Sequence, residues 1–174
     1  MPEPPTHVFL QAGVGGFAAA VAANLTLSLP TKPAFIIVEP DLAACLFESN
    51  QKRRPTRIDA HQPTIMAMLE CYEPSLLAWD ILSRLADAFM TVTDQDALSA
   101  MKRLARPQHA EEAIVAGESG GVGLSGLRGL LKDKKACEKL GLNENSRVLL
   151  FNTEGATAPN LYKELVAADA AVPA

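Results

Sequence analysis

The chain has 174 residues, of which 48% are hydrophobic and 21% are charged, and its formal net charge is −4. This length is sufficient for one domain with its own core, and the composition is that of a globular protein. Lysine and arginine are scattered along the chain, with only short clusters at 52–54 and 132–135, which argues against nucleic acid as the main partner. The longest apolar stretch, residues 17–29, is interrupted by polar residues and is too short to cross a bilayer, so we expect no membrane association.

The cysteines and the N-terminus indicate the compartment. Cys45, Cys71 and Cys137 are odd in number and far apart, and no C-x-x-C pair occurs, so neither a disulfide framework nor a zinc site is predicted. The three histidines lack spaced partners, so no metal site is expected. The N-terminal MPEPPTH has neither the charged nor the apolar region of a secretory signal. We therefore expect a cytoplasmic protein.

Apolar runs and helical patterns alternate along the first half of the chain. Residues 7–12 form a predicted buried strand, and residues 15–29 a predicted helix that Pro30 ends. A second buried strand follows at 34–38. Asp41 is predicted to cap a helix that runs to about residue 49, and the next segment to residue 63 is predicted to be a loop.

The same alternation continues in the second half. A helix is predicted over 75–87 with Ser75 as its cap, and a short strand over 89–92. Asp94 is predicted to cap the next helix, which runs to about residue 105. Residues 113–116 form a fourth apolar segment.

The last third opens on GESGGVGLSGLRGLL, a glycine-rich turn that leads into a helix. A short helix over 136–140 is predicted to end at Gly141, and a last strand to cover 148–151. Pro159 is placed in the first turn of a final helix, and the alanine-rich tail, residues 167–174, is expected to fray. This alternation predicts an α/β fold of three layers, with a mostly parallel sheet and flanking helices.

Residues 8–20, VFLQAGVGGFAAA, combine a strand, a glycine turn and a helix. Free backbone N–H groups at such a helix start bind anions. One interpretation is a dinucleotide site of an NAD(P)-binding Rossmann-like domain. Gly13, Gly15 and Ala18 fit the pattern G-x-G-x-x-A, and Glu39 ends the second strand where a ribose-binding carboxylate is expected.

A second interpretation is a site for pyridoxal phosphate, whose single phosphate also suits the turn. Two later loops, GESG at 117–120 and NTEG at 152–155, each combine a hydroxyl, a carboxylate and a glycine. Ligands gather at the carboxyl ends of parallel strands, and a hydroxyl such as that of Thr153 can hydrogen-bond a pyridine nitrogen. Together the three loops favour one site. A non-catalytic protein that dimerises through uncovered apolar surface is the third alternative.

The ordered motifs resemble a known family along nearly the whole chain, from about Pro5 to about Val166. The segments THVFLQAGVGG, IIVEP, TIMA, PSLLAW, GESGGVGL and NTEGAT resemble the C-terminal half of diaminopropionate ammonia-lyases, which are fold type II, tryptophan-synthase-β-like pyridoxal phosphate enzymes. The resemblance implies that residues 1–174 form a single partial domain of such an enzyme. It also implies α,β-elimination of 2,3-diaminopropionate to pyruvate and ammonia, with pyridoxal 5′-phosphate as the cofactor and a homodimer as the assembly.

The resemblance also assigns site residues. It implies that the phosphate-binding loop consists of Gly13, Val14, Gly15 and Gly16. Thr153 stands where the family places a hydroxyl against the pyridine nitrogen. Glu118, Ser119 and Gly120 resemble the loop that lines the cofactor ring in the family. Departures from the family pattern at Met68, Glu70, Tyr72, Ala156 and Ala158 concern substrate specificity.

The lysine that such enzymes use lies in an upstream motif flanked by asparagine and phenylalanine. None of the eight lysines of this chain, at positions 32, 52, 102, 132, 134, 135, 139 and 163, has that context. The resemblance therefore implies that this chain contains no catalytic residue and is inactive alone. It also implies a small amino acid as the substrate of the complete enzyme.

Overall fold

The structure is a computed structural model that describes residues 3–109 and 111–167. Four strands form one sheet in the order β3-β2-β1-β4, and its three pairings are all parallel. The strands are β1 (His7–Gln11), β2 (Ala34–Pro40), β3 (Ala88–Val92) and β4 (Val148–Leu150). Within the register, Phe9 lies opposite both Ile36 and Leu150. The predicted strands are confirmed, and of the alanine-rich tail expected to fray only Ala167 lies within the described residues.

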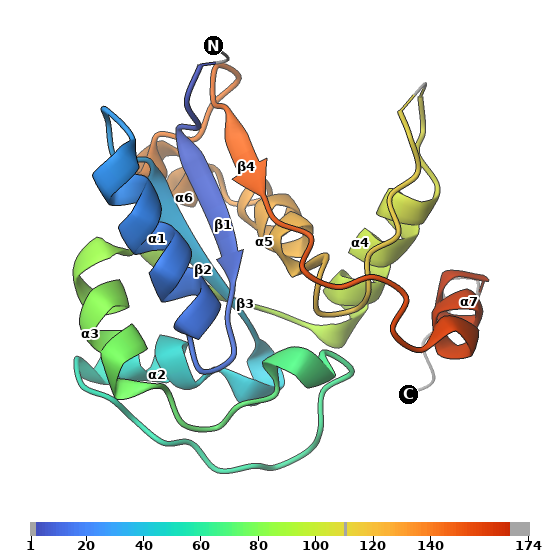
Figure 1. Cartoon of the computed structure of the whole chain (residues 1–174), viewed down its shortest axis with the longest axis horizontal. Coiled ribbons are helices and arrows are strands. Elements are labelled where there is room, and N and C mark those ends of the chain that lie inside the picture. The colour runs from blue at the N-terminus through green and yellow to red at the C-terminus, as the bar shows by residue number, and fades with distance from the viewer. Residues whose placement is uncertain (1–2, 110, 168–174) are drawn as a thin grey trace.

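Helices cover both faces of the sheet (Figure 1). The helices are α1 (Gly16–Ser28), α2 (Cys45–Lys52), α3 (Leu76–Leu85), α4 (Asp94–Ala105), α5 (Val122–Leu130) and α6 (Lys134–Leu140). Val8 and Leu10 of β1 pack in the cluster that contains residues of α1, α2 and α3, whereas Phe9 packs in the cluster on the opposite face, with residues of α4 and α5. Because both faces are buried, the central strands are apolar without alternation. The predicted three-layer α/β architecture is confirmed.

The last helix, α7 (Pro159–Ala167), lies beside α4, away from the sheet (Figure 1). Three predicted helix ends are confirmed. Pro159 is the first residue of α7, and the Ser75 hydroxyl accepts a hydrogen bond from the Ala78 amide at the start of α3. Gly141 ends α6 with a left-handed φ of 72°. Residues 111–117, which include the fourth apolar segment, contain neither helix nor strand.

Two predicted helix caps are wrong. Asp41 opens a short 3-10 turn, Asp41–Ala43, and α2 begins only at Cys45. The side chain of Glu39 serves the start of α2 instead, since its two carboxyl oxygens accept hydrogen bonds from the amides of Leu46 (2.8 Å) and Phe47 (2.6 Å). An acceptor from a neighbouring strand satisfies the first-turn amides as well as a local cap does.

The second wrong cap is Asp94, which lies in the first turn of α4. Thr93 caps this helix, because its hydroxyl and the carboxylate of Asp96 form a reciprocal capping box. The Asp94 carboxylate instead accepts hydrogen bonds from the Thr64 hydroxyl and the Ile65 amide. Asp94 thereby anchors the long segment between α2 and α3.

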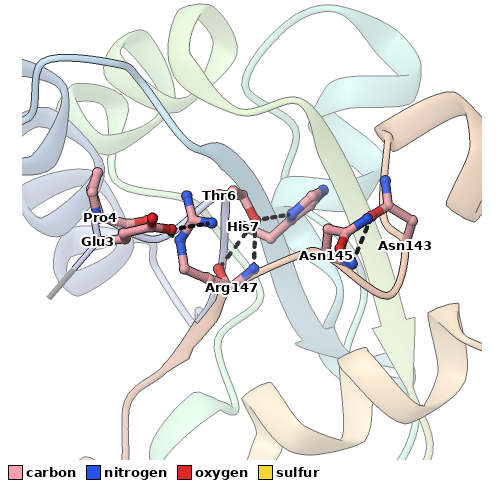
Figure 2. Close-up of polar contacts among 7 residues, drawn as sticks. All are labelled: Glu3, Pro4, Thr6, His7, Asn143, Asn145 and Arg147. Atoms are coloured by element: carbon pink, nitrogen blue, oxygen red, sulfur yellow. Dashed lines mark hydrogen bonds and ion pairs between the residues drawn. The ribbon is translucent and has the colours of Figure 1, made fainter.

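A polar cluster fixes the beginning of the sheet (Figure 2). The Arg147 guanidinium pairs with Glu3 (2.8 Å) and donates to the Pro4 carbonyl (2.8 Å). The Arg147 amide donates to the Thr6 hydroxyl, and the buried ring of His7 bonds both Thr6 and the Leu140 carbonyl. These contacts join the starts of β1 and β4, so their carboxyl ends are held side by side at the opposite edge of the sheet.

Candidate functional site

The turn from β1 to α1 leaves an open helix start. Gly15 has a φ of 93°, in the left-handed region that favours glycine. No side chain caps α1, and its first turn contains no acidic residue. A Cβ added at Gly16 would meet no atom within 4 Å. The start of α1 therefore has no side-chain cap for its first-turn amides, and the positive end of the helix dipole lies behind them.

A cavity of about 490 Å³ lies at this edge of the sheet. All three predicted loops contribute to it. Its lining includes the four residues of the turn, Gly13, Val14, Gly15 and Gly16, together with Ser119 and Thr153. The structure thus brings together six of the eight residues that the family resemblance assigns to the cofactor. Glu118 and Gly120 are not among the lining residues.

Glu154 holds the two later loops together. One oxygen of its carboxylate accepts hydrogen bonds from the amides of Ser119 (2.9 Å) and Gly120 (3.1 Å), and its carbonyl accepts one from the Gly117 amide (2.9 Å). Gly120 is thereby bonded to a residue that lines the cavity but does not line it itself. The Ser119 hydroxyl accepts a hydrogen bond from the Met68 amide (3.2 Å), which attaches the 3-10 turn Ala67–Leu69 to the same wall.

Several lining residues were not predicted from the sequence as site residues. Gln11, Phe17 and Cys71 line the cavity, and so does Met68, which the sequence flagged only as a departure from the family pattern. Cys71 lies close to the turn, since a Cβ on Gly13 would come within 3.0 Å of its sulfur. For Gln11 the sequence does contain a signal of a site position, because Gln11 ends β1 and the strand leads directly into the glycine turn.

Glu39 does not serve the role that the dinucleotide interpretation requires. Its side chain is fully buried and is not among the residues that line the cavity. Both of its oxygens are engaged by the amides at the start of α2. Burial raises the pKa of Glu39 to about 8, and the two amide hydrogen bonds oppose that rise. The expected ribose contact is therefore wrong.

The raised pKa predicts a pH-dependent stability. The ordinary pKa of the Glu39 carboxyl is 4.5, so between 4.5 and about 8 the folded protein retains a proton that the unfolded chain releases. The free energy of unfolding should therefore fall as pH rises through this window, on the order of 1.4 kcal/mol for each pH unit. Urea unfolding of wild type and Glu39→Gln across this range measures the slope. Equal slopes in the two proteins would contradict the assignment.

None of the eight lysines lines the cavity. Within residues 3–109 and 111–167, no group of three or more histidine, cysteine or acidic side chains is arranged to hold a metal ion. No helix in the same ranges has the length and apolar character that crossing a membrane requires. Besides backbone amides, hydroxyls and apolar side chains, the cavity is lined by the Gln11 amide, the Cys71 thiol and the Glu154 carboxylate.

A parallel sheet covered by helices, with a glycine turn, an uncapped helix start and a hydroxyl at the carboxyl ends of its strands, is typical of the class of proteins that bind a phosphate-bearing coenzyme. The family described as pyridoxal-phosphate dependent enzymes matches residues 1–154. The chain belongs to this family.

Curated relatives agree with this assignment. A diaminopropionate ammonia-lyase of Escherichia coli K12 is 40% identical over 166 residues, which cover 93% of this chain and 42% of the relative. The enzyme of that name from Salmonella typhimurium LT2 is 34% identical over 169 residues. The chain thus spans about 42% of the length of these relatives.

Solved structures show the same likeness. The holo form of the Escherichia coli diaminopropionate ammonia-lyase superimposes with a TM-score of 0.84 at 38% identity, covering 95% of this chain and 42% of that chain. The same enzyme has been solved with an aminoacrylate–pyridoxal phosphate azomethine reaction intermediate. The processed form of threonine deaminase isoform 2 from Solanum lycopersicum, at 18% identity and a TM-score of 0.71, shares the fold over 94% of this chain and 45% of that chain. The resemblance inferred from the motifs is confirmed.

Proposed function

We propose that this chain forms the cofactor-binding part of an enzyme that eliminates ammonia from 2,3-diaminopropionate, giving pyruvate and ammonia. The observation that carries the proposal is the convergence of three separate loops on one cavity, with the open start of α1 at one side and the Thr153 hydroxyl among the lining groups. The identity to diaminopropionate ammonia-lyases supports the choice of substrate. We further propose that residues 1–174 are a single partial domain of that enzyme.

The residues present fit pyridoxal phosphate. The amides of Gly13, Val14, Gly15 and Gly16 would hold the phosphate, and the space that a side chain at Gly16 would fill is open. Thr153 would donate its hydroxyl proton to the pyridine nitrogen. Ser119 would border the ring, whereas Glu118 and Gly120 would act through the position of that loop. When bound, the cofactor supplies an electron sink for the charge left by removal of the substrate α-proton.

This chain's own side chains bind and orient but do not transfer protons. The amide dipoles of the turn and α1 fix the phosphate end, and Glu154 keeps the Ser119 loop in place. Leu69, Met68 and Phe17 supply an apolar wall that limits water at the ring. Since no lysine lines the cavity, we propose that the chain by itself binds the cofactor without covalent attachment and is inactive.

The assembly and the compartment are also part of the proposal. Leu76 and Leu77, in the first turn of α3, are 70% and 72% exposed, which supports a dimer that covers them. Cys45, Cys71 and Cys137 are all free thiols, which supports a reducing compartment such as the cytoplasm. Sedimentation of wild type and of Leu77→Gln tests the dimer.

Ligand titration tests the proposed function. Pyridoxal 5′-phosphate should bind at least about 10-fold more tightly than pyridoxal, because only the phosphate reaches the amides of the turn. Inorganic phosphate should compete, and borohydride reduction should leave no pyridoxyl–lysine adduct by mass spectrometry. Equal binding of the two aldehydes, or a lysine adduct that depends on the cavity, would contradict the proposal. Tight binding of NAD would favour the dinucleotide alternative.

A further inference from the structure

We infer that Gln11 is a positioning residue that sets the direction of the Thr153 hydroxyl, so that Thr153 donates its proton into the cofactor cavity. The inference rests on the proposed function, because the pyridine nitrogen is the acceptor that this proton would serve. The inference gives Gln11, which lines the cavity beside Thr153, control over the direction in which the Thr153 hydroxyl donates.

The contacts of Gln11 are those of a buried and directed amide. Gln11 is the last residue of β1 and is 2% exposed. Its Nε2 donates to the Thr153 hydroxyl (2.8 Å) and to the Phe151 carbonyl (3.1 Å), with the Gly120 carbonyl further away (3.4 Å). Two of these acceptors are backbone carbonyls, which accept hydrogen bonds but cannot donate them, so the group of Gln11 that faces them must be a donor. The NH₂ group, and not the oxygen, must therefore point toward Thr153.

The hydroxyl of Thr153 is polarised by this contact. Its oxygen accepts the Gln11 N–H, and an NH₂ group cannot accept a proton in return. No group in the described part of the chain accepts a hydrogen bond from Thr153. The proton is thus free for an acceptor in the cavity, and Gln11 keeps the hydroxyl from turning it toward the protein.

Gln11 serves this contact at a cost to the fold. Its Oε1 is buried and has no hydrogen-bond partner among the described residues. A buried acceptor without a donor destabilises the folded state, and an aliphatic side chain of similar size would avoid that penalty. The amide therefore contributes something that a purely structural residue would not, namely the directed hydrogen bond to Thr153.

Two variants separate direction from mere contact. Gln11→Met keeps the length of the side chain but removes the donor. Gln11→Glu, when ionised, replaces the donor with an acceptor, so the Thr153 proton turns toward residue 11 and the lone pairs face the cavity. Thr153→Val removes the hydroxyl, and Thr153→Ser restores it. Ser125→Ala is the matched control, since it removes a buried hydroxyl that bonds the Asp96 carbonyl and does not line the cavity.

The experiment measures dissociation constants for pyridoxal 5′-phosphate and for its 1-deaza analogue, in which C–H replaces the ring nitrogen. Wild type, Thr153→Ser and Ser125→Ala should prefer the nitrogen-containing probe by about 10-fold. Gln11→Met and Thr153→Val should lose most of this preference, and Gln11→Glu should lose it entirely. A second readout is the ¹⁵N shift of labelled pyridoxal phosphate, which should report a hydrogen-bonded ring nitrogen in wild type and lose that signature in Gln11→Glu.

The possible failures are distinguishable. If wild type binds pyridoxal phosphate but Gln11→Met keeps the full preference and the same ¹⁵N shift, the inference about Gln11 is overturned while the proposed function stands. If wild type binds neither probe, the inference about Gln11 and the proposed function are both overturned.

A measurement without ligand provides an independent test of the inference. The Gln11 side-chain amide protons should exchange slowly in wild type and faster in Thr153→Val, and equal exchange in the two proteins would also overturn the inference.

Discussion

Gly15→Ala is expected to lower the free energy of unfolding by about 2 to 4 kcal/mol. Two effects add. Gly15 has a φ of 93°, which strains any residue with a Cβ, and the new methyl would lie 3.0 Å from Leu46, 3.1 Å from Ala78 and 3.2 Å from Leu82. The methyl would contact residues of both α2 and α3, so a shift of one side chain would not remove the crowding. Urea unfolding followed by circular dichroism measures the change.

Gly141→Ala is the matched control for the strain alone. Gly141 also has a positive φ, of 72°, but a Cβ there would meet nothing within 4 Å. Its substitution should lower the free energy of unfolding by about 1 kcal/mol. A loss in Gly15→Ala no larger than that in Gly141→Ala would show that the core beneath the turn yields to the added methyl.

Gly16→Asp is expected to reduce the affinity for pyridoxal 5′-phosphate by at least about 100-fold, because the new carboxylate takes the amides and repels the phosphate. The same change should leave the free energy of unfolding unchanged or raise it by up to about 1 kcal/mol, since an acidic residue suits a helix start. A side chain here meets open space, so crowding does not enter. Titration by absorbance and urea unfolding measure the two effects.

Ala20→Asp places the same charge about one turn further along α1, at an exposed position outside the cavity lining. It should retain most of the affinity. Gly16→Ala separates the size of the side chain from its charge and should weaken binding less than Gly16→Asp. Undiminished binding by Gly16→Asp would mean that the phosphate lies elsewhere, and the proposed role of the turn would be wrong.

Local patterns predicted the elements well because the forces that form them are local. The run at 34–38 lies within a buried strand, and Gly141 ends a helix where its lack of a Cβ matters. The caps of α2 and α4 were mistaken for a different reason. Asp41 and Asp94 suit a cap by residue type, but Glu39 from the adjacent strand and Thr93 with its capping box satisfied those amides instead.

The candidate site shows the same division. The glycine turn and the Thr153 loop could be proposed from residue type and from resemblance to a family. Glu39 was equally plausible as a ribose ligand, since a carboxylate at a strand end looks the same in sequence whether it faces solvent or the core. Only its burial and its two amide partners removed it from the site.

The sequence by itself determined the alternation of strands and helices, the position of the glycine turn and the family, because periodicity, conformational preference and motif order are properties of the chain. The tertiary structure alone decided which loops meet. Parallel pairing places the ends of β1 and β4 side by side, and so brings Gln11 within 2.8 Å of Thr153, 142 residues away along the chain. Such a contact depends on the register of the sheet, which arises from packing on both of its faces and leaves no mark in either local segment.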